Sequence, residues 1–589
     1  MLTLGIAGLA NVTGFLEQHF PEQMAKDSRV VQGMDAAAAL LLDGRIIAAA
    51  SEERFDRNKK SGAFPFQAIR YCLNEAGATL AEVSDICCNF NFGRYRPIYT
   101  SEDLPRAYWQ KCLAPDAIFN LLKTQFRAGN ATQFHPIDHH DAHLHAALAS
   151  CEFEQGLGVV MDAAGEIGAT SVYHFDGPKI MRLARYPVTQ SLGLFYSLVT
   201  QFLGYAFNED EYKVMGLASF GDPQRYRTFF RSAIRLGPNG SIEIPCLTLN
   251  RGFTESLFFT GSAGALAEGL GIDGNTCSHQ ERADLSAALQ ERFREALFHI
   301  CGHYRQQTRA TNLLLSGGCA ENCAAIGELR SNGMFERIHV AYASGDEGTA
   351  LGAAAAHVFS NGAPLHLPGV MPFFGPAPRP DRVRSIVAQD STLALREFDD
   401  EQQMLDSAAA DIAADKIVAL CHGRMEYGAR ALGNRSLLAL PAKAENKDRI
   451  NLAIKKRQNY RPFAPAVAAE DAHRYFVLNA GEEYPYMTML THVREEAKAL
   501  LPAVTHVDGT ARVQTVCRDH NAAFYYLLSR LKALTGVPVV LNTSYNVNHQ
   551  PIVCTEEEAL DTFLEMGIDA LYIANARVAL RDDPRLGLA

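Results

Sequence analysis

The first 50 residues have the hydrophobic pattern of β-strands. Apolar runs cover residues 2–9, 36–42 and 45–50, and the last two are separated only by Asp43-Gly44. An Asp-Gly pair between two apolar runs is a strong signal for a β-hairpin. The pattern therefore predicts a strand followed, after a polar excursion at 11–33, by a hairpin.

Strand and helix patterns alternate along the rest of the chain. Short continuous apolar runs indicate buried strands, and apolar positions at helical spacing indicate amphipathic helices. The expected strands are at 85–90, 156–161, 312–315, 417–421 and 537–541. The expected helices are at 66–76, 141–150, 280–305, 350–358, 403–414 and 556–564. This alternation predicts an α/β fold.

A composition shift divides the chain. Residues 361–380 are rich in proline and glycine, which is typical of a linker or a wrapping arm between domains. No tandem repeat is visible. We predict two α/β domains, at 1–365 and 385–589, joined by a linker at 366–384.

Charge and cysteine usage narrow the function classes. The net charge of −11 argues against a general nucleic-acid binder or a binder of anionic membranes. Thirteen cysteines include no CxxC pair, so neither a zinc ribbon nor a disulfide scaffold is indicated. The apolar runs are shorter than a membrane span, and the N-terminus lacks a signal-peptide pattern. We expect a cytoplasmic protein.

The segment HHDAH at 139–143 carries the strongest local signal for chemistry. His139 and His143 are four residues apart, so on a helix they share one face and can hold one metal ion. The alternative is a polar helix edge with unrelated histidines. His140 stands where a zincin protease needs its glutamate, which argues against that class.

Two carboxylates are candidate oxygen ligands for the same ion. Asp162 ends an apolar strand and enters a loop of small residues, and Asp346 precedes a helix rich in small residues. A carboxylate at a strand end before glycines can meet a metal or phosphates. The alternative for Asp346 is an ordinary helix N-cap.

Other segments are weaker candidates for binding phosphate groups. Residues 316–322, SGGCAEN, join a strand to a helix, where glycines let a nucleotide approach the backbone. A tight turn explains the same glycines. Lys213 and Lys59 lie in segments that can touch phosphate, but most lysines are simply solvated.

The second half of the chain concentrates cations and a polar loop. A phosphate pocket accounts for the cations, and surface salt bridges are the alternative. The loop 541–546, LNTSYN, follows a buried strand and either holds a small polar group or builds a turn. The cations concerned are Arg424, Arg430, Arg435, Lys455, Lys456, Arg457, Arg461 and Arg512.

Taken in order, these motifs resemble the O-carbamoyltransferase family of nodulation and antibiotic-tailoring enzymes, over nearly the whole chain. The segments that carry the resemblance are SEERFDRNKK at 51–60, HHDAH at 139–143, MDAAGE at 161–166, SLGLFYSLVTQFLGY at 191–205, KVMGLASFG at 213–221, SGGCAEN at 316–322, DEGTALGAA at 346–354, YGARALGNRS at 427–436, IKKRQNYRPFAP at 454–465 and LNTSYN at 541–546.

The resemblance implies an N-terminal domain with an actin-like ATPase fold and a C-terminal YrdC-like domain. It implies that carbamoyl phosphate and ATP form carbamoyl-adenylate in the C-terminal domain. The carbamoyl group then passes to a substrate hydroxyl in the N-terminal domain, with AMP and pyrophosphate as by-products. The acceptor implied is a hydroxylated small molecule, and the oligomeric state stays open.

The resemblance also implies roles for individual residues. His139, His143, Asp162 and Asp346 are the implied ligands of a divalent metal, with Fe²⁺ as the first choice and Mn²⁺ or Mg²⁺ as the alternatives. Nucleotide binding in the N-terminal domain falls to Gly165, Lys213, Gly317, Gly318 and Asn322. Binding of carbamoyl phosphate and the adenylate falls to Arg430, Lys455, Met487, Arg512, Asn542, Ser544 and Asn546. The candidate catalytic residues are Asp35, Lys59 and His139.

Two positions depart from the family pattern. Many relatives carry His-Asp where this chain has Met34-Asp35, and that histidine is the natural base for the acceptor hydroxyl. Without that histidine, the base is expected to be Asp35 or His19, or the metal lowers the pKa of the acceptor hydroxyl directly. Relatives also follow the LNTSxN loop with Gly-Glu-Pro-Ile, whereas this chain has His549-Gln550-Pro551-Ile552, which bears on the turn geometry.

Three other functions compete with this one. A tRNA threonylcarbamoyl-transferase-like enzyme fits the ancestry, but the acidic charge opposes it. Hydrogenase maturation proteins join the same domain types in the opposite order and carry CxxC motifs, which this chain lacks. A non-catalytic ATP-binding interaction module would not need four metal ligands. Residues 11–33 and 91–133 are where an acceptor pocket is expected.

Overall fold

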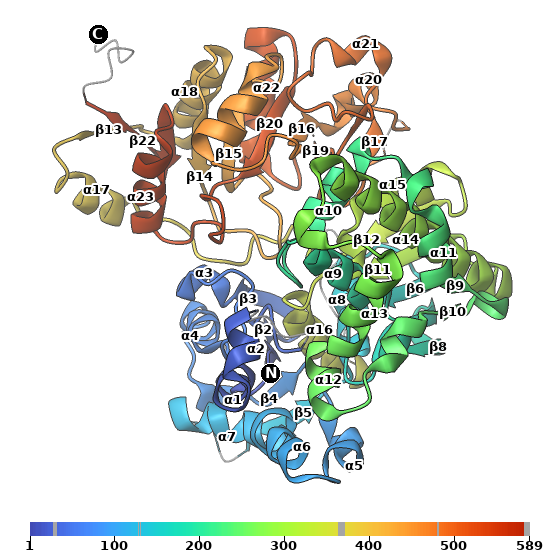
Figure 1. Cartoon of the computed structure of the whole chain (residues 1–589). Helices are drawn as coiled ribbons and strands as arrows, with labels where there is room; N and C mark the ends of the chain where they lie inside the picture. Colours follow the sequence, from blue (N-terminus) through green and yellow to red (C-terminus); the bar gives the residue numbers. More distant parts are fainter. Residues whose placement is uncertain (27–31, 128, 130, 363–370, 480–481, 582–589) are drawn as a thin grey trace. The chain divides into compact units, whose positions relative to one another are not determined.

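The computed structural model describes residues 1–26, 32–127, 129, 131–362, 371–479 and 482–581. The chain divides into two compact units (Figure 1). The first comprises Met1–Asp56 and Lys60–Gly369, and the second comprises Arg57–Lys59 and Val370–Ala589. The short segment Arg57–Lys59 therefore belongs with the second unit although its neighbours in sequence belong to the first.

The first unit begins with a mixed five-stranded sheet in the order β3-β2-β1-β4-β5. β1 pairs antiparallel with β2 and parallel with β4, and β4 pairs parallel with β5. The hairpin predicted around Asp43-Gly44 is confirmed, because β2 and β3 pair from Leu42 and Arg45 outward. The strands are β1 (Leu2–Ala7), β2 (Ala37–Leu42), β3 (Arg45–Ser51), β4 (Asp85–Cys88) and β5 (Gln133–Pro136).

A second five-stranded sheet of this unit has the order β12-β11-β6-β7-β8. β6 pairs antiparallel with β7 and parallel with β11, so its topology repeats that of the first sheet. The sequence shows no such repeat, because topology depends on burial and alternation and not on residue identity. The strands are β6 (Gln155–Met161), β7 (Gly168–Asp176), β8 (Lys179–Pro187), β11 (Asn312–Ser316) and β12 (Arg337–Val340).

Two small-residue helices, α8 (His139–Leu148) and α16 (Gly348–Ser360), pack against each other. α16 also packs on β1, β2 and β4, and α8 on β6 and β11. The helices approach so closely that a Cβ on Gly352 would lie 1.8 Å from the carbonyl oxygen of Ala142. Glycine at this position therefore sets the spacing of the two helices.

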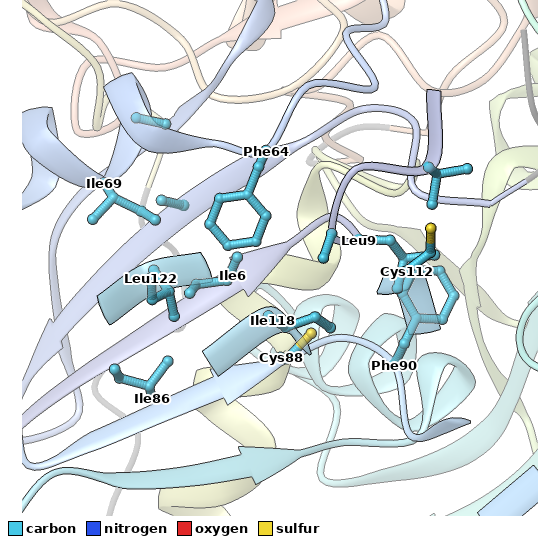
Figure 2. Packing of buried hydrophobic residues seen from close by; sticks show 14 of the residues in the cluster. Ile6, Leu9, Phe64, Ile69, Ile86, Cys88, Phe90, Cys112, Ile118 and Leu122 are labelled. Carbon is cyan, nitrogen blue, oxygen red and sulfur yellow. The ribbon is translucent and has the colours of Figure 1, made fainter. Parts of the chain in front are cut away.

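The opposite face of the first sheet packs into a hydrophobic core (Figure 2). Ile6 of β1 and Ile86 and Cys88 of β4 face Ile118 and Leu122 of α7. Successive strand residues point to opposite faces, so the residues between them point toward α16. Further helices of this unit are α1 (Val12–His19), α2 (Pro21–Lys26), α3 (Glu53–Asp56), α4 (Phe66–Glu75), α5 (Arg96–Tyr99), α6 (Asp103–Tyr108), α7 (Pro115–Gln125), α9 (Leu192–Phe202), α10 (Glu211–Leu217), α11 (Arg227–Ala233), α12 (Phe253–Phe258), α13 (Thr260–Leu270), α14 (His279–Thr308) and α15 (Cys323–Ser331).

The second unit contains an eight-stranded mixed sheet in the order β13-β22-β21-β14-β15-β20-β16-β19. Its strands are β13 (Leu393–Glu397), β14 (Val418–Cys421), β15 (Arg435–Ala439), β16 (Ala464–Ala468), β19 (Gln514–Val516), β20 (Val539–Ser544), β21 (Ala570–Ile573) and β22 (Ala576–Leu580). Its longer helices are α17 (Pro380–Val387), α18 (Glu401–Ala413), α22 (Ala522–Thr535) and α23 (Glu556–Met566).

The structure confirms the α/β class and the main elements predicted from periodicity. The long helix expected at 280–305 is α14, and the helix expected at 141–150 is α8, which begins two residues earlier. The polar excursion at 11–33 contains α1 and α2, whereas its residues 27–31 lie outside the described part. Residues 366–370 of the expected linker lie outside it as well.

Candidate functional site

Four side chains of the first unit converge on one point, and all four were candidate metal ligands in the sequence. His139 and His143 lie one turn apart on α8, which begins after Asp138, whose carboxylate accepts from the Asp141 amide. Asp162 follows β6 directly, and Asp346 lies two residues before α16. The ligand atoms of the four all lie within 4.8 Å of one another.

The separations of these atoms fit a single ion. Nε2 of His139 lies 3.2 Å from Asp162 Oδ2 and 3.4 Å from Asp346 Oδ1. Nε2 of His143 lies 3.8 Å and 3.3 Å from the same two oxygens. With metal–ligand bonds of about 2.1 Å, adjacent ligands of a tetrahedral or octahedral ion lie about 3.0–3.4 Å apart. The cluster therefore has the dimensions of a coordination shell.

The tautomer of His139 favours a cation at this point. Its Nδ1 lies 3.2 Å from the carbonyl oxygen of Asn89, which can only accept, so Nδ1 carries the proton. A neutral His139 then presents a lone pair at Nε2, which lies 3.1 Å from Nε2 of His143. Phe90 stacks on the His139 ring at 4.4 Å and holds its orientation. Hydrogen bonding at the second nitrogen is usual for a metal-bound histidine.

The electrostatics of the cluster are those of a cation site. Burial opposes the charged form of His139, but Asp346 and Asp162 outweigh it and hold the pKa of His139 well above its usual value. Burial likewise opposes ionisation of Asp162, but His139 and His143 hold the pKa of Asp162 well below its usual value. The carboxylates thus attract positive charge, which a divalent ion supplies as well as a proton does. Two imidazoles and two carboxylates suit a divalent transition metal.

A buried carboxylate supports the cluster from behind. Glu166 Oε1 accepts from the backbone N–H groups of Asn91 at 2.7 Å and of His139 at 3.1 Å. Its Oε2 pairs with Arg185 at 3.3 Å. These bonds fix the start of α8 and the segment after β4. Glu166 belongs to the MDAAGE motif, but the sequence did not predict its role. The spacing of residues in a motif does not reveal which backbone N–H groups a carboxylate will bind.

The glycines predicted to bind nucleotide lie against the same cluster. Gly317 has φ +88°, and a Cβ there would lie 2.3 Å from the carbonyl oxygen of Met161. The Gly318 N–H donates to Asp162 Oδ1 at 3.3 Å. A Cβ on Gly165 would lie 3.3 Å from His139. The loops after β6 and β11 therefore meet at the cluster.

Asn322 and Lys213 have structural partners in the first unit. Asn322 caps α15 by accepting from the Ala325 amide, and it exchanges two hydrogen bonds with Gln290. Lys213 is buried and pairs with Asp210 at 2.8 Å, so it is not the solvated lysine of the alternative interpretation. Nucleotide binding by either residue stays a prediction.

Asp35 lies in an acidic, buried environment beside Lys60. Oδ2 of Asp35 lies 3.5 Å from Nζ of Lys60. Burial raises the pKa of Asp35 to about 6, although Lys60 lowers it, and Asp346 contributes to the rise. A carboxyl group with this pKa can accept a proton near neutral pH. His19, the alternative base, is exposed and packs on Phe15.

In the second unit, Lys455, Ser544 and Asn546 come together. Lys455 Nζ donates to Ser544 O at 2.6 Å, to Ser544 Oγ at 3.3 Å and to Asn546 Oδ1 at 3.3 Å. Ser544 Oγ also donates to Asn546 Oδ1 at 2.6 Å. Residues predicted from two separate motifs therefore form one polar cluster at the end of β20.

Lys455 is a buried cation without a carboxylate beside it. Its exposed fraction is 3%, and no ion pair among the described residues includes it. Burial, reinforced by Arg457, Arg461 and Lys59, holds the pKa of Lys455 well below its usual range. Lys59, a predicted catalytic residue, thus acts electrostatically on Lys455 within the second unit. Such a concentration of positive charge favours the binding of an anion.

The remaining predicted residues of the second unit lie on separate segments. Asn542 is buried inside the sheet and donates to Gln514 Oε1 and Ala431 O. Met487 is buried with φ +55°, and Arg430 and Arg512 are part-buried. Arg430 lies between β14 and β15, and Arg512 lies just before β19. Their binding roles stay predictions.

Comparison with known proteins assigns the chain to a family. The family described as Carbamoyltransferase N-terminus matches residues 31–355, and the one described as Carbamoyltransferase C-terminus matches residues 409–579. The chain belongs to the carbamoyltransferase family. It is therefore an enzyme that transfers a carbamoyl group, as the order of motifs predicted.

Individual relatives agree with this assignment. Nodulation protein NolNO of Sinorhizobium fredii is 36% identical over 94% of this chain and 81% of its own length. Nodulation protein NolO of Bradyrhizobium diazoefficiens is 39% identical over 74% of this chain and 78% of its own length. The 3'-hydroxymethylcephem-O-carbamoyltransferase of Streptomyces clavuligerus is 27% identical over 88% of this chain and 92% of its own length.

Among the described residues, no helix is both long enough and apolar enough to cross a bilayer.

Proposed function

We propose that this carbamoyltransferase is ATP-dependent and makes carbamoyl-adenylate from carbamoyl phosphate. The second unit forms the adenylate, and the first unit transfers the carbamoyl group to a hydroxyl of a small-molecule acceptor. The repeated sheet topology of the first unit supports an actin-like ATPase fold for it. The family resemblance supports a YrdC-like fold for the second unit, and the free cysteines support a cytoplasmic location.

The buried cation Lys455 carries the proposal. A lysine at 3% exposure, surrounded by further positive charge and bonded only to neutral oxygens, is stabilised when an anion binds. The hydroxyl of Ser544 and the amide of Asn546 add groups that recognise phosphate or carbamoyl oxygens. Carbamoyl phosphate and the adenylate both supply such an anion.

The reaction balances in three steps. Water cleaves carbamoyl phosphate into carbamate and phosphate. A carbamate oxygen attacks the α-phosphorus of ATP, and the bond to pyrophosphate breaks. The acceptor hydroxyl oxygen then attacks the carbamoyl carbon, AMP leaves with the bonding electron pair, and a base takes the hydroxyl proton. The adenylate is needed because the nitrogen lone pair of carbamate makes its carbonyl a poor electrophile.

The four-ligand cluster of the first unit fits a divalent metal, with Fe²⁺ favoured over Mn²⁺ and Mg²⁺ by the resemblance. His139, His143, Asp162 and Asp346 would hold it, and the ion would supply Lewis-acid stabilisation of developing negative charge. Asn89 and Glu166 orient His139 through its ring and its backbone. Gly165, Gly317 and Gly318, which lie against this cluster, are the proposed nucleotide-binding glycines.

Asp35 is the proposed base. It lies near enough to the cluster for Asp346 to affect its pKa, and a value of about 6 suits proton acceptance at neutral pH. Lys60, at 3.5 Å, keeps the carboxylate ionised and oriented. This arrangement replaces the histidine that many relatives carry at position 34.

The acceptor is proposed to be a small hydroxylated molecule and not tRNA, because a net charge of −11 opposes a polyanion. A relative named for 3'-hydroxymethylcephem supports a hydroxymethyl or similar alcohol as the acceptor class. The test is incubation with carbamoyl phosphate, ATP and a panel of hydroxylated metabolites. Carbamoylated product together with AMP is expected, and the absence of carbamoyl phosphate-dependent AMP would refute the proposal.

A further inference from the structure

A second group of potential metal ligands lies in the first unit, apart from the four-ligand cluster. Asp85 begins β4, His135 lies in β5, and His357 lies in the last turn of α16. Each offers one ligand atom, and the three atoms lie within 4.8 Å of one another. None of the three had a role in the sequence analysis, and none belongs to the proposed reaction.

Strand alternation places Asp85 and His135 on one face of the sheet. In the parallel pair β4–β5, Asp85 lies opposite Gln133 and Cys87 opposite His135. Ile86, between Asp85 and Cys87, points into the core on the other face (Figure 2). Asp85 and His135 are therefore diagonal neighbours on the face that α16 covers.

α16 brings the third residue to this face. Ala353 of α16 packs with Cys87 of β4. His357 lies four residues after Ala353, so it points from the same side of the helix toward the start of β4. It is also nine residues, or about 14 Å, from Gly348 at the N-terminal end of the helix. The group is thus remote from Asp346 and the four-ligand cluster.

The distances suit direct coordination. Asp85 Oδ1 lies 2.8 Å from Nε2 of His135 and 3.3 Å from Nε2 of His357. The two imidazole rings stack with centroids 4.0 Å apart, so both present a nitrogen toward the same carboxylate. The exposed fractions of the side chains are 11% for Asp85, 30% for His135 and 11% for His357. An ion and its waters can therefore reach the group.

His357 Nε2 faces both a hydrogen-bond donor and a carboxylate, so neither neutral tautomer satisfies both neighbours. Its Nε2 lies 3.1 Å from Nδ2 of Asn361, a donor that requires a lone pair there. The same nitrogen lies 3.3 Å from Asp85 Oδ1, an acceptor that requires a proton. Asn361 is oriented by donating to the His357 carbonyl as well.

We propose that Asp85, His135 and His357 form a second divalent-metal site, with Zn²⁺ as the favoured ion. Two imidazoles and one carboxylate are a common zinc ligand set, and water completes the shell. The ion joins β4, β5 and the C-terminal end of α16, so it stabilises the packing of α16 on the sheet. The inference does not depend on the proposed function.

The test counts tightly bound metal in chelator-stripped protein titrated with Zn²⁺. His357→Gln and the shape-conserving Asp85→Asn should each lose one equivalent relative to wild type. Both should also lose the part of the Zn²⁺-dependent rise in melting temperature that this ion provides. His174→Gln, a histidine on β7 outside these groups, is the matched control and should bind like wild type. Circular dichroism establishes that each variant is folded.

The position of the ion separates this site from the four-ligand cluster. Anomalous diffraction from Zn²⁺-soaked crystals should show a peak between Asp85, His135 and His357. His143→Gln should leave that peak in place whether or not the four-ligand cluster binds metal. Unchanged zinc stoichiometry in folded His357→Gln and Asp85→Asn, with no peak at this position, would overturn the proposal.

Discussion

At the residue scale, Lys455 shows how burial turns an ordinary side chain into a binding group. Apart from the family resemblance, nothing in the sequence distinguishes it from the adjacent Lys456, yet Lys455 is buried while Lys456 is exposed. Desolvation and neighbouring positive charge make the cation unfavourable until an anion arrives. This is the basis of the proposed phosphate site, and the two lysines form a natural pair for testing it.

Lys455→Met should reduce carbamoyl phosphate-dependent exchange of pyrophosphate into ATP by about 100-fold, the effect of losing about 3 kcal/mol of charge-assisted hydrogen bonding. Lys456→Met, on the exposed neighbour, is the control and should retain the wild-type rate. The assay uses labelled pyrophosphate at saturating ATP. Equal activity of the two variants would remove Lys455 from the phosphate site.

Binding of the anion should also raise the pKa of Lys455. Burial and neighbouring positive charge hold that pKa low in the free protein, and an anion beside the amine favours its charged form. A titration of the Lys455 side chain by NMR, with and without carbamoyl phosphate, should show a higher pKa with the ligand. An unchanged pKa would place the anion away from Lys455.

Asp35→Asn should abolish carbamoyl transfer and leave adenylate formation within a few-fold of wild type, because only transfer needs the base. In wild type, the rate of transfer should rise about tenfold per pH unit below pH 6 and level off above it, as the carboxyl group with a pKa of about 6 ionises. Asp103→Asn, at an exposed carboxyl, is the control. Normal transfer by Asp35→Asn would exclude Asp35 as the base.

At the scale of elements, turn chemistry decided what could be predicted. The hairpin of β2 and β3 was predicted because an Asp-Gly pair favours a turn with positive φ at both residues. The structure has this turn, with φ of 49° at Asp43 and 76° at Gly44. The hairpin of β21 and β22 was missed. Its two-residue turn, Ala574-Asn575, also has positive φ at both positions, but alanine gives no such signal.

Ala574→Asn should stabilise the second unit by about 0.5–1 kcal/mol, because asparagine tolerates the left-handed conformation that strains alanine. The measurement is the midpoint of urea unfolding monitored on the second unit. Asn575→Ala, which adds the same strain at the next position, should shift the midpoint the other way. A lower midpoint for Ala574→Asn would contradict this explanation of the turn.

Helix periodicity identified two of the candidate metal ligands but not the residues that support them. His139 and His143 were found because an i, i+4 pair on a helix needs only local spacing. Asn89 and Glu166, which orient His139, lie 50 residues before it and 27 residues after it. Their contacts depend on strand order, which one sequence does not reveal. Asp85, His135 and His357 were missed for the same reason.

At the scale of the whole molecule, the sequence predicted the α/β class and the carbamoyltransferase family. It did not reveal that the two sheets of the first unit share one topology, because the repeat is structural and not residue by residue. It also did not reveal that Arg57–Lys59 belong with the second unit. Arg57 donates to the carbonyl oxygens of Pro551 and Ile552, contacts made across nearly the whole chain length.

In the proposed reaction, two half-reactions belong to two groups of residues, one in each unit. Adenylate formation is proposed to depend on Lys455 and its polar neighbours, and transfer is proposed to depend on the four-ligand cluster and Asp35. If this division is right, a change in the four-ligand cluster leaves the first half-reaction intact. A single shared site would instead lose both together.

The most direct test measures both half-reactions in His143→Gln and Lys455→Met. With the half-reactions divided in this way, His143→Gln should retain carbamoyl phosphate-dependent pyrophosphate exchange within a few-fold of wild type and lose carbamoylation of the acceptor. Lys455→Met should lose both activities. Equal loss of exchange and transfer in a folded His143→Gln protein would contradict the division of the reaction between the two groups.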